Sequence, residues 1–330
     1  MKKVIIISIF VISIVLFNIP AEKVPDPRDV KTLRSLSDIQ IFPKDYIWNV
    51  PVDTMPVTSN SATYIAYSSP SNYMGIGEDY PINIVDGSTP RQYLSKISYP
   101  DQSDNIPYPI PINAVVQSSP DHHMLIVDTS ANKLYELYNA NKNNDGTWEA
   151  ESAVVFDLSS NLLRKDGYPS ADAAGLPIVP GLIRFDEVEA GSINHALRVA
   201  LPTTGMAYVW PARSGGVQNS ISYPPMGQRF RLKASFDMSG FNTHQKVILT
   251  ALKKYGIILA DNRGTSDTFE LSAVPDSRWS NDIGYAAFQS LHLSDFEAVD
   301  VSSLMINKDS GQARTTISPV QMPIQTYLLD

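Results

Sequence analysis

Short stretches rich in apolar, β-branched and aromatic residues, separated by polar turn residues, recur along the chain, a pattern typical of β-strands. Met124–Thr129 and Lys133–Tyr138 are two such stretches, joined by three residues that suit a hairpin turn. Asn143–Gly146 then turns the chain toward a third stretch, Trp148–Asp157. These segments predict an antiparallel meander, in which one face of the sheet is commonly buried.

Apolar residues recur with the period of an α-helix in one segment, after Asn242. Between Thr243 and Tyr255, apolar residues recur every three or four positions, and Gly256 then ends the pattern. The sequence therefore predicts one packed helix over 243–255. After it, the apolar run Ile257–Ala260 predicts a short buried strand that ends at Asp261.

Turn-forming residues elsewhere in the chain favour short strands and long loops. The chain has 24 prolines among its 330 residues, and clusters of Ser, Asn and Asp separate its apolar segments. No internal repeat of solenoid or propeller period is present. We predict a mostly β fold, a single β-sandwich or jelly-roll-like domain with the helix over 243–255 packed on it.

The first residues have the pattern of an export signal. Met1–Lys3 carries positive charge, Val4–Phe17 is almost wholly apolar, and Pro20 and Ala21 follow. We expect a signal peptide over 1–21, a flexible tether over 22–45, a β-rich domain over 46–304 and a C-terminal extension over 305–330. The expected location is secreted, periplasmic or at the cell surface, without stable membrane insertion once the signal is cleaved.

Composition removes several classes of function. The chain has no cysteine, so disulfides and cysteine nucleophiles are excluded. The formal net charge is -8 and no basic block is present, so nucleic acid is not an expected partner. No phosphate-binding glycine loop and no zinc-binding HExxH sequence occurs, and neighbouring His122 and His123 point to opposite faces of a strand. We therefore expect no cofactor and no metal.

Two histidines lie on apolar strand faces. In Ile193–Val199, His195 alternates with apolar residues while Arg198 points the other way, and His123 shares its face with Leu125 and Val127. A histidine in such a place is either a core residue with a satisfied hydrogen bond or the titratable group of a cleft. The pattern leaves both interpretations open.

Carboxylates and aromatic residues supply the other parts of a candidate site. Asp172 and Asp261 lie beside turns shaped by Gly or Pro, and Tyr208 and Trp210 offer flat faces for sugar rings. Each of these residues, taken singly, is more often structural. The predicted catalytic residues are His195, Asp261, Asp172 and His123, and the predicted substrate-binding residues are Arg198, Arg231, Lys233, Trp210 and Tyr208.

Two hypotheses concern groups of these residues. Arg229, Arg231 and Lys233 alternate with apolar residues and form a row of cations, which either is solvated or neutralises an anionic sugar such as a uronate. His195 and Asp261 both follow elements that can carry them into one depression. There the carboxylate would orient the imidazole and raise its affinity for a proton.

Longer blocks of sequence carry a resemblance: AAGLPIVPGLIRFDEV, INHALRVALP, YVWPAR, PPMGQRFRLKASFDMSGF, LKKYGIILADN and DFEAVDVSSL. The chain resembles a family of exported bacterial and fungal proteins to which no activity is attached. The resemblance runs from Tyr46 to Leu304 and covers His195, Arg198, Lys233 and Asp261. It implies one module in secreted proteins, often of organisms that degrade or build polysaccharide.

The predicted function is an exported carbohydrate-active enzyme that cleaves a polysaccharide by general acid/base chemistry, as a glycoside hydrolase or as a lyase on a uronate-containing chain. The alternative is a non-catalytic carbohydrate-binding or surface-structural β module. We favour the enzyme because the candidate residues include titratable groups on apolar faces and at strand ends, where pKa values move toward neutrality. The expected partner is a polysaccharide or other glycan.

Overall fold

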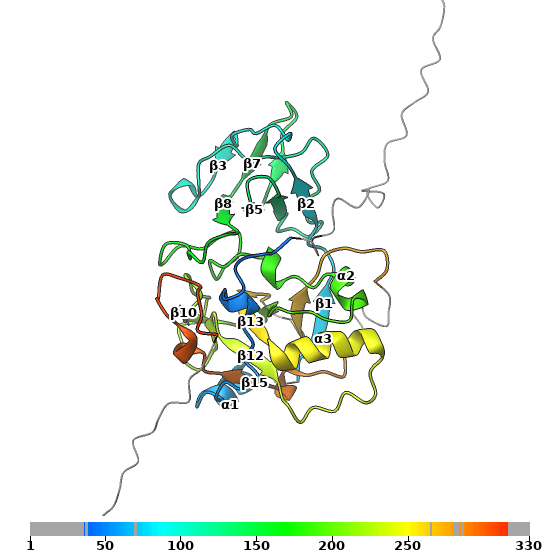
Figure 1. The fold of residues 1–330 in the computed structure, drawn as a ribbon. Helices are drawn as coiled ribbons and strands as arrows, with labels where there is room; N and C mark the ends of the chain where they lie inside the picture. The colour runs from blue at the N-terminus through cyan, green and yellow to red at the C-terminus, as the bar shows by residue number, and fades with distance from the viewer. Residues whose placement is uncertain are drawn as a thin grey trace, which may run out of the picture. The chain divides into compact units, whose positions relative to one another are not determined.

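The structure is a computed structural model that describes residues 36, 39–68, 71–264, 266–279, 284 and 287–315. All of these residues belong to one unit, residues 34–330. Strand residues outnumber helical ones, several sheets are present and helices are few, which confirms the predicted mostly β fold (Figure 1). No helix in the described ranges has the length and apolarity that a membrane span requires. The predicted signal peptide lies outside the described residues.

The largest sheet has six strands drawn from distant parts of the chain. In spatial order they are β1 (Tyr73–Gly77), β14 (Thr268–Ser272), β9 (Leu197–Leu201), β13 (Ile257–Asn262), β12 (Arg229–Leu232) and β15 (Phe296–Val299). β1 pairs with β14 and β9 with β13 in parallel, whereas the other three pairs are antiparallel. β9, which contains residue 200, therefore lies at the centre of this sheet.

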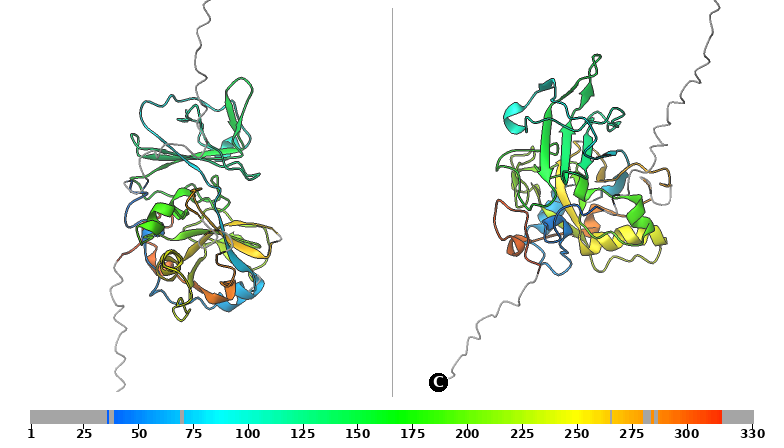
Figure 2. Two further views of the ribbon diagram at one scale, coloured as in Figure 1. Left: turned by 90° about the vertical axis from the view of Figure 1, so that its right-hand side faces the viewer. Right: turned by 45° about the horizontal axis from the view of Figure 1, so that its top comes forward.

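The second sheet has four strands, β2 (Ile82–Val85), β4 (Met124–Asp128), β5 (Lys133–Tyr138) and β8 (Ser152–Asp157). β4, β5 and β8 form the predicted antiparallel meander, and the right-hand view of Figure 2 shows the long strands side by side. Asp128 fixes the first turn because its carboxylate accepts hydrogen bonds from the backbone N–H groups of Ser130 and Ala131.

The smaller elements complete the fold. The three-stranded sheet consists of β3 (Lys96–Ile97), β7 (Trp148–Ala150) and β6 (Asn141–Lys142), and the two-stranded sheet of β10 (Gly205–Tyr208) and β11 (Pro225–Met226). The described 3-10 helices are η3 (Ile47–Asn49), η4 (Pro100–Gln102), η5 (Val179–Gly181), η6 (Leu293–Asp295) and η7 (Ser302–Leu304). The expected strand over 148–157 is therefore divided between two sheets.

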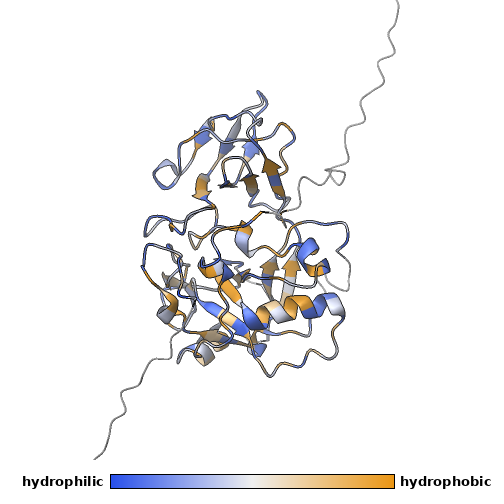
Figure 3. Cartoon of the chain, viewed as in Figure 1, coloured by the Kyte–Doolittle hydropathy of each residue, from blue (hydrophilic) through white to orange (hydrophobic). Residues whose placement is uncertain are grey.

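The two larger sheets share one hydrophobic core. Alternate residues of the four-stranded sheet, including Leu125, Val127 and Leu134, pack in the same cluster as Leu197 and Val199 of β9. The intervening residues face a second cluster on the other side of the four-stranded sheet. This arrangement is consistent with a β-sandwich, and Figure 3 shows apolar residues on the strands of both sheets.

Three α-helices are described: α1 (Ser61–Tyr67), α2 (Phe185–Glu189) and α3 (Thr243–Lys254). α3 is the predicted helix, with Tyr255 as its C-cap residue and Val247, Ile248, Ala251 and Leu252 buried. Gly256 ends it with a φ of 66°, and a Cβ there would lie 2.0 Å from the carbonyl oxygen of Phe230. The helix prediction is confirmed.

Replacing Asn242 with alanine is expected to lower the free energy of unfolding by about 1 kcal/mol. Asn242 caps α3: its side chain accepts a hydrogen bond from the Gln245 N–H, and the Gln245 side chain accepts one from the Asn242 N–H. Urea unfolding measures the loss, with Thr250→Ala at an exposed position of the same helix as the control. A stability of Asn242→Ala equal to that of the parent would show that the capping box contributes nothing.

The domain begins earlier and continues further than predicted. Ile41 and Phe42, assigned to a flexible tether, are buried in the main core, and Phe42 stacks on Tyr46 with ring centres 4.3 Å apart. Ala313, assigned to the C-terminal extension, is also buried, and its N–H donates to the carbonyl oxygen of Asp45. Burial of these apolar side chains is the reason that both described ends are part of the domain.

Candidate functional site

Arg198 of β9 lies at the centre of a cluster of buried polar groups. Its Nε and Nη2 atoms donate to the two carboxylate oxygens of Asp172, at 2.7 and 2.8 Å. Nη2 also donates to Asp261 Oδ2 at 2.9 Å, and Nη1 donates to Ser272 Oγ at 2.8 Å. We call these four residues the Arg198 centre; three of them were predicted site residues.

The sheet brings these residues together. β13 and β14 lie on the two sides of β9 and carry Asp261 and Ser272, respectively. The pairing of β13 with β9 shifts register between Leu259 and Asp261, which places Asp261 opposite Ala200. Asp172 comes from the loop before η5, where Gly175 has a φ of 71° and its N–H donates to the Asp172 carbonyl oxygen.

Exposure differs sharply within the Arg198 centre. The side chains of Asp172 and Arg198 are 0% and 1% exposed, whereas that of Asp261 is 25% exposed. Burial raises the pKa of Asp172 to about 6, although Arg198 opposes this shift. Burial acts to lower the pKa of Arg198, but Asp172, Tyr80 and Asp261 together raise it well above its usual value. Asp261 is therefore the carboxylate of the centre that solvent or a substrate can reach.

An aromatic layer connects the Arg198 centre to the four-stranded sheet. The guanidinium carbon of Arg198 lies 5.3 Å from the ring centre of Tyr80, and the Tyr80 ring lies 5.5 Å from the ring of His123. His123 in turn lies 5.5 Å from the Tyr138 ring. Burial raises the pKa of Tyr80 to about 12, so its hydroxyl stays protonated at neutral pH.

His123 is a core residue and not part of a cleft wall. It is 2% exposed; its Nδ1 lies 2.5 Å from Gln117 Oε1, and its Nε2 lies 2.9 Å from the carbonyl oxygen of Ala171. Burial lowers its pKa, and the nearby Arg198 lowers it further. A substrate cannot touch this ring, so His123 positions the Ala171–Asp172 segment and does not transfer a proton to substrate.

The electrostatics of Tyr138 link Asp261 to other acidic groups. Burial raises the pKa of the partly exposed Tyr138, and the negative charges of Asp121, Glu151 and Asp261 raise it further. The exposed Tyr99 contributes in the same direction. Asp121 and Asp261 are thus two partly exposed carboxylates whose charges both act on the same tyrosine.

The predicted pairing of His195 with Asp261 is wrong. His195 Nδ1 lies 2.8 Å from the carbonyl oxygen of Ala196, and its Nε2 lies 3.2 Å from Glu187 Oε2, while Asp261 is held by Arg198. His195 precedes β9, which starts at Leu197, so strand alternation does not fix its direction. Burial would raise the pKa of Glu187, but His195 and Arg184 lower it overall, so the carboxylate stays ionised.

The row of cations on β12, predicted either to be solvated or to bind an anionic sugar through Arg231 and Lys233, is bound largely to protein groups. Arg229 is 1% exposed and donates to the carbonyl oxygens of Ile47, Val50 and Tyr255; burial lowers its pKa to about 9. Arg231 binds Glu297 at 2.8 Å, and the Lys233 ammonium donates to the Ser294 carbonyl oxygen at 2.7 Å. Strands and loops cover this face of β12, so its cations bind protein groups.

Tyr208 and Trp210 have separate surroundings. Tyr208 is 37% exposed and its hydroxyl donates to Asp166 at 3.2 Å, whereas the Trp210 Nε1–H donates to the Ser310 carbonyl oxygen at 2.8 Å. No contact in the described ranges joins either side chain to Asp261. Of the two, Tyr208 keeps a face open to solvent.

The sequence interpretation missed several residues around the Arg198 centre, namely Tyr80, Gln117, Asp121, Tyr138 and Glu136. Glu136 is 0% exposed and accepts hydrogen bonds from the N–H groups of Ile178 and Val179. A charged residue within an apolar strand, as in Leu134–Tyr138, was the available signal for it. Tyr80 and Gln117 lie in irregular segments, and no local pattern indicated their contacts.

No group of three or more histidine or carboxylate side chains in the described ranges is arranged to hold a metal ion. Comparison with protein families, with curated proteins and with solved structures gives no match for this chain.

Proposed function

We propose that the protein is an exported enzyme that cleaves a polysaccharide by general acid/base chemistry, with Asp261 as the carboxylate that acts on the substrate. The observation that carries this proposal is the exposure gradient of the Arg198 centre. Asp172 and Arg198 are buried and fixed by paired hydrogen bonds. Arg198 also donates to Oδ2 of the 25% exposed Asp261, whose Oδ1 accepts a hydrogen bond from the Asn262 N–H. Such a preorganised carboxylate is suited to act as a base or nucleophile.

Cleavage of a glycosidic bond also requires a second group that protonates the leaving oxygen. Asp121 is the candidate because it is partly exposed and its charge, like that of Asp261, raises the pKa of Tyr138. The exposed Tyr99 and the partly exposed Tyr138 supply flat apolar faces on which sugar rings stack. Hydrolysis is favoured over lyase chemistry because Arg231 and Lys233, the proposed partners of a uronate, are bound to protein groups.

Export is supported by the sequence alone, through the positive start and the apolar run Val4–Phe17. The resemblance to exported bacterial and fungal proteins points the same way. A secreted, periplasmic or surface location would bring the enzyme to extracellular polysaccharide, which is the proposed partner.

A non-catalytic carbohydrate-binding module is the second candidate. It is favoured by the burial of Arg198, Asp172 and His123, each at most 2% exposed. A buried, hydrogen-bonded ion pair is also a structural feature of proteins without activity. In that case the tyrosines beside Asp261 serve for contact with a glycan only.

Replacing Asp261 with asparagine is expected to lower turnover at least a hundredfold, because a carboxylate that accepts or shares a proton in the reaction contributes factors of about 10² to 10⁴. A panel of neutral and anionic polysaccharides identifies the substrate, with reducing ends and unsaturated products both recorded. Asp267→Asn, at an exposed aspartate in the loop before β14, is the matched control.

The outcomes separate the two candidates. Products from the parent and the control, with none from Asp261→Asn, support the proposed enzyme. Binding of a polysaccharide without any product supports the module. Equal turnover by all three proteins would remove Asp261 from the reaction.

A further inference from the structure

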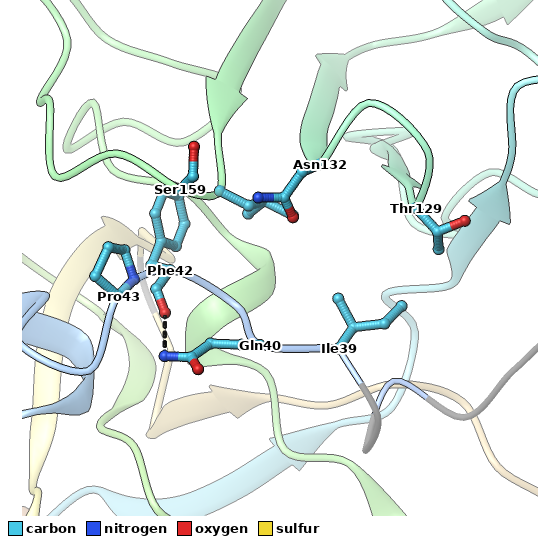
Figure 4. Close-up of a pocket in the computed structure, with 8 residues that line it drawn as sticks. Ile39, Gln40, Phe42, Pro43, Thr129, Asn132 and Ser159 are labelled. Carbon is cyan, nitrogen blue, oxygen red and sulfur yellow. Dashed lines mark hydrogen bonds between the residues drawn. The ribbon is translucent and has the colours of Figure 1, made fainter.

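A hollow of about 480 Å³ lies away from the Arg198 centre, where the segment 39–43 passes two turns of the four-stranded sheet (Figure 4). One turn, with Thr129 and Asn132, joins β4 to β5, and the other, with Leu158 and Ser159, follows β8. The volume lies within the range of small-molecule sites. None of the residues of the Arg198 centre lines this hollow.

The lining of the hollow is uncharged. Its eight residues comprise apolar side chains, such as Ile39 and Leu158, and neutral polar ones, such as Gln40 and Asn132. A carboxylate, phosphate or ammonium group would lose its hydration there without gaining an opposite charge. The ligand that fits is therefore neutral, with both an apolar and a hydrogen-bonding part.

Two amide groups at the hollow have hydrogen-bonding capacity to spare. The exposed Asn132 side chain makes no hydrogen bond to another residue in the described part of the chain, and Figure 4 shows it on the opposite side of the hollow from Ile39 and Gln40. The Gln40 Nε2 atom donates to the Phe42 carbonyl oxygen at 3.0 Å, so its own side-chain oxygen remains as an acceptor. Together they offer donors and an acceptor, the complement of a ligand amide.

The wall of the hollow includes one strained residue. Phe42 has a φ of 64°, in the left-handed region that an aromatic residue rarely adopts, whereas the φ of 52° at Asn132 is one that asparagine adopts readily in a hairpin loop. Phe42 is kept there by stacking on Tyr46, and the Asn49 side chain donates to the neighbouring Pro43 carbonyl oxygen at 2.9 Å. Strain that the fold maintains in this way is characteristic of preorganised ligand sites.

We propose that this hollow, defined by Ile39, Gln40, Phe42, Asn132 and Leu158, binds the acetamido group of an N-acetylated sugar. The amide of that group pairs with Asn132 and Gln40, and its methyl group packs against Ile39 and Leu158. A sugar that lacks the acetyl group forms neither the amide hydrogen bonds nor the methyl contacts, and a free amino sugar brings a charge into an uncharged site. The site retains a glycan independently of any cleavage at Asp261.

The test is binding of N-acetylglucosamine oligomers, followed by isothermal titration and by backbone amide shifts in NMR spectra of the complete protein. Glucosamine and glucose oligomers of the same length are the comparison ligands. We expect at least tenfold tighter binding of the acetylated oligomer, with the largest shifts at residues 39–43 and 129–132. Equal affinities for the three oligomers, or no binding of the acetylated one, would overturn the proposal.

Asn132→Gly is the diagnostic variant because glycine adopts a φ of 52° without strain while the amide is removed. Asn139→Gly is its control, since Asn139 also has a positive φ, of 50°, but does not line the hollow. We expect the acetyl preference to disappear in the first variant and to persist in the second. Retention of the preference in Asn132→Gly contradicts the proposed site, whereas loss of turnover in Asp261→Asn bears on the proposed enzyme alone.

Discussion

Replacing Arg198 with methionine is expected to lower the free energy of unfolding by about 3 to 5 kcal/mol, the usual cost of removing one partner from a buried ion pair. The variant leaves the fully buried Asp172 without the two hydrogen bonds of 2.7 and 2.8 Å that satisfy its carboxylate. Methionine fills most of the arginine volume, so the loss reports the charge more than a cavity. Urea unfolding at two pH values measures it.

The pH dependence of that loss identifies its cause. Burial raises the pKa of Asp172 to about 6 even with Arg198 in place, and removal of the guanidinium raises it further. In the unfolded chain Asp172 has its usual pKa of 3.8 and loses its proton as the pH rises above that value. The folded Arg198→Met variant keeps this proton to a higher pH. The loss should be larger at pH 8 than at pH 5.

A second substitution provides the control. Asp172→Asn combined with Arg198→Met removes both charges, and the double variant should recover part of the stability lost in Arg198→Met. If Arg198→Met costs less than about 1 kcal/mol at pH 8, the ion pair is not what holds the Ala171–Asp172 segment against the sheet.

The features that the sequence predicted correctly are local ones. The meander over 124–157 and the helix α3 each depend on a pattern within about 15 residues and on a turn or cap beside it. The predicted faces of the four-stranded sheet also hold, since Leu125 and Val127 enter the main core. Periodicity suffices for these features because neighbouring residues determine them.

The features that it missed depend on distant parts of the chain. Alternation places Arg229 and Arg231 on one face of β12, but it does not show that residues 47–55 and 297 cover that face. The parallel pairing of β9 with β13 joins residues about sixty positions apart, and it brings Asp261 to Arg198 and not to His195. His195 instead pairs with Glu187 of α2, eight residues before it, because residue 195 precedes β9 and strand alternation does not fix its direction.

The two sites proposed here differ in their electrostatics, which gives them different roles. Asp261 is ion-paired with Arg198, whereas the hollow beside Asn132 has no ionisable side chain in its lining. A charged centre can move protons, and a neutral amide-lined hollow can recognise a substituent but cannot catalyse acid/base cleavage. A glycan that is both N-acetylated and cleaved by the protein would satisfy both proposals. A negative result for one proposal leaves the other untouched, because they concern different residues.

Replacing Glu136 with glutamine is expected to make the protein less sensitive to pH between about 4.5 and 8. Burial raises the pKa of the fully buried Glu136 to about 8, although the N–H groups of Ile178 and Val179 favour its ionised form. The folded protein keeps the proton while the unfolded chain releases it near pH 4.5, so this group's contribution to stability is complete below pH 4.5 and is lost as the pH rises to 8. At about 1.4 kcal/mol per pKa unit, the loss amounts to a few kcal/mol.

Glutamine removes this titration and keeps one side-chain oxygen to accept both backbone N–H groups, which contact Glu136 Oε1 at 2.8 and 3.0 Å. The difference in unfolding free energy between Glu136→Gln and the parent, measured in urea at pH 5 and pH 9, should therefore move in favour of the variant as the pH rises. Glu149→Gln, at a partly exposed glutamate of β7, controls for the change in net charge. If that difference is the same at both pH values, Glu136 is ionised in the fold throughout. In that case the three N–H contacts to the Glu136 carboxylate, and not a retained proton, offset the cost of burying this side chain.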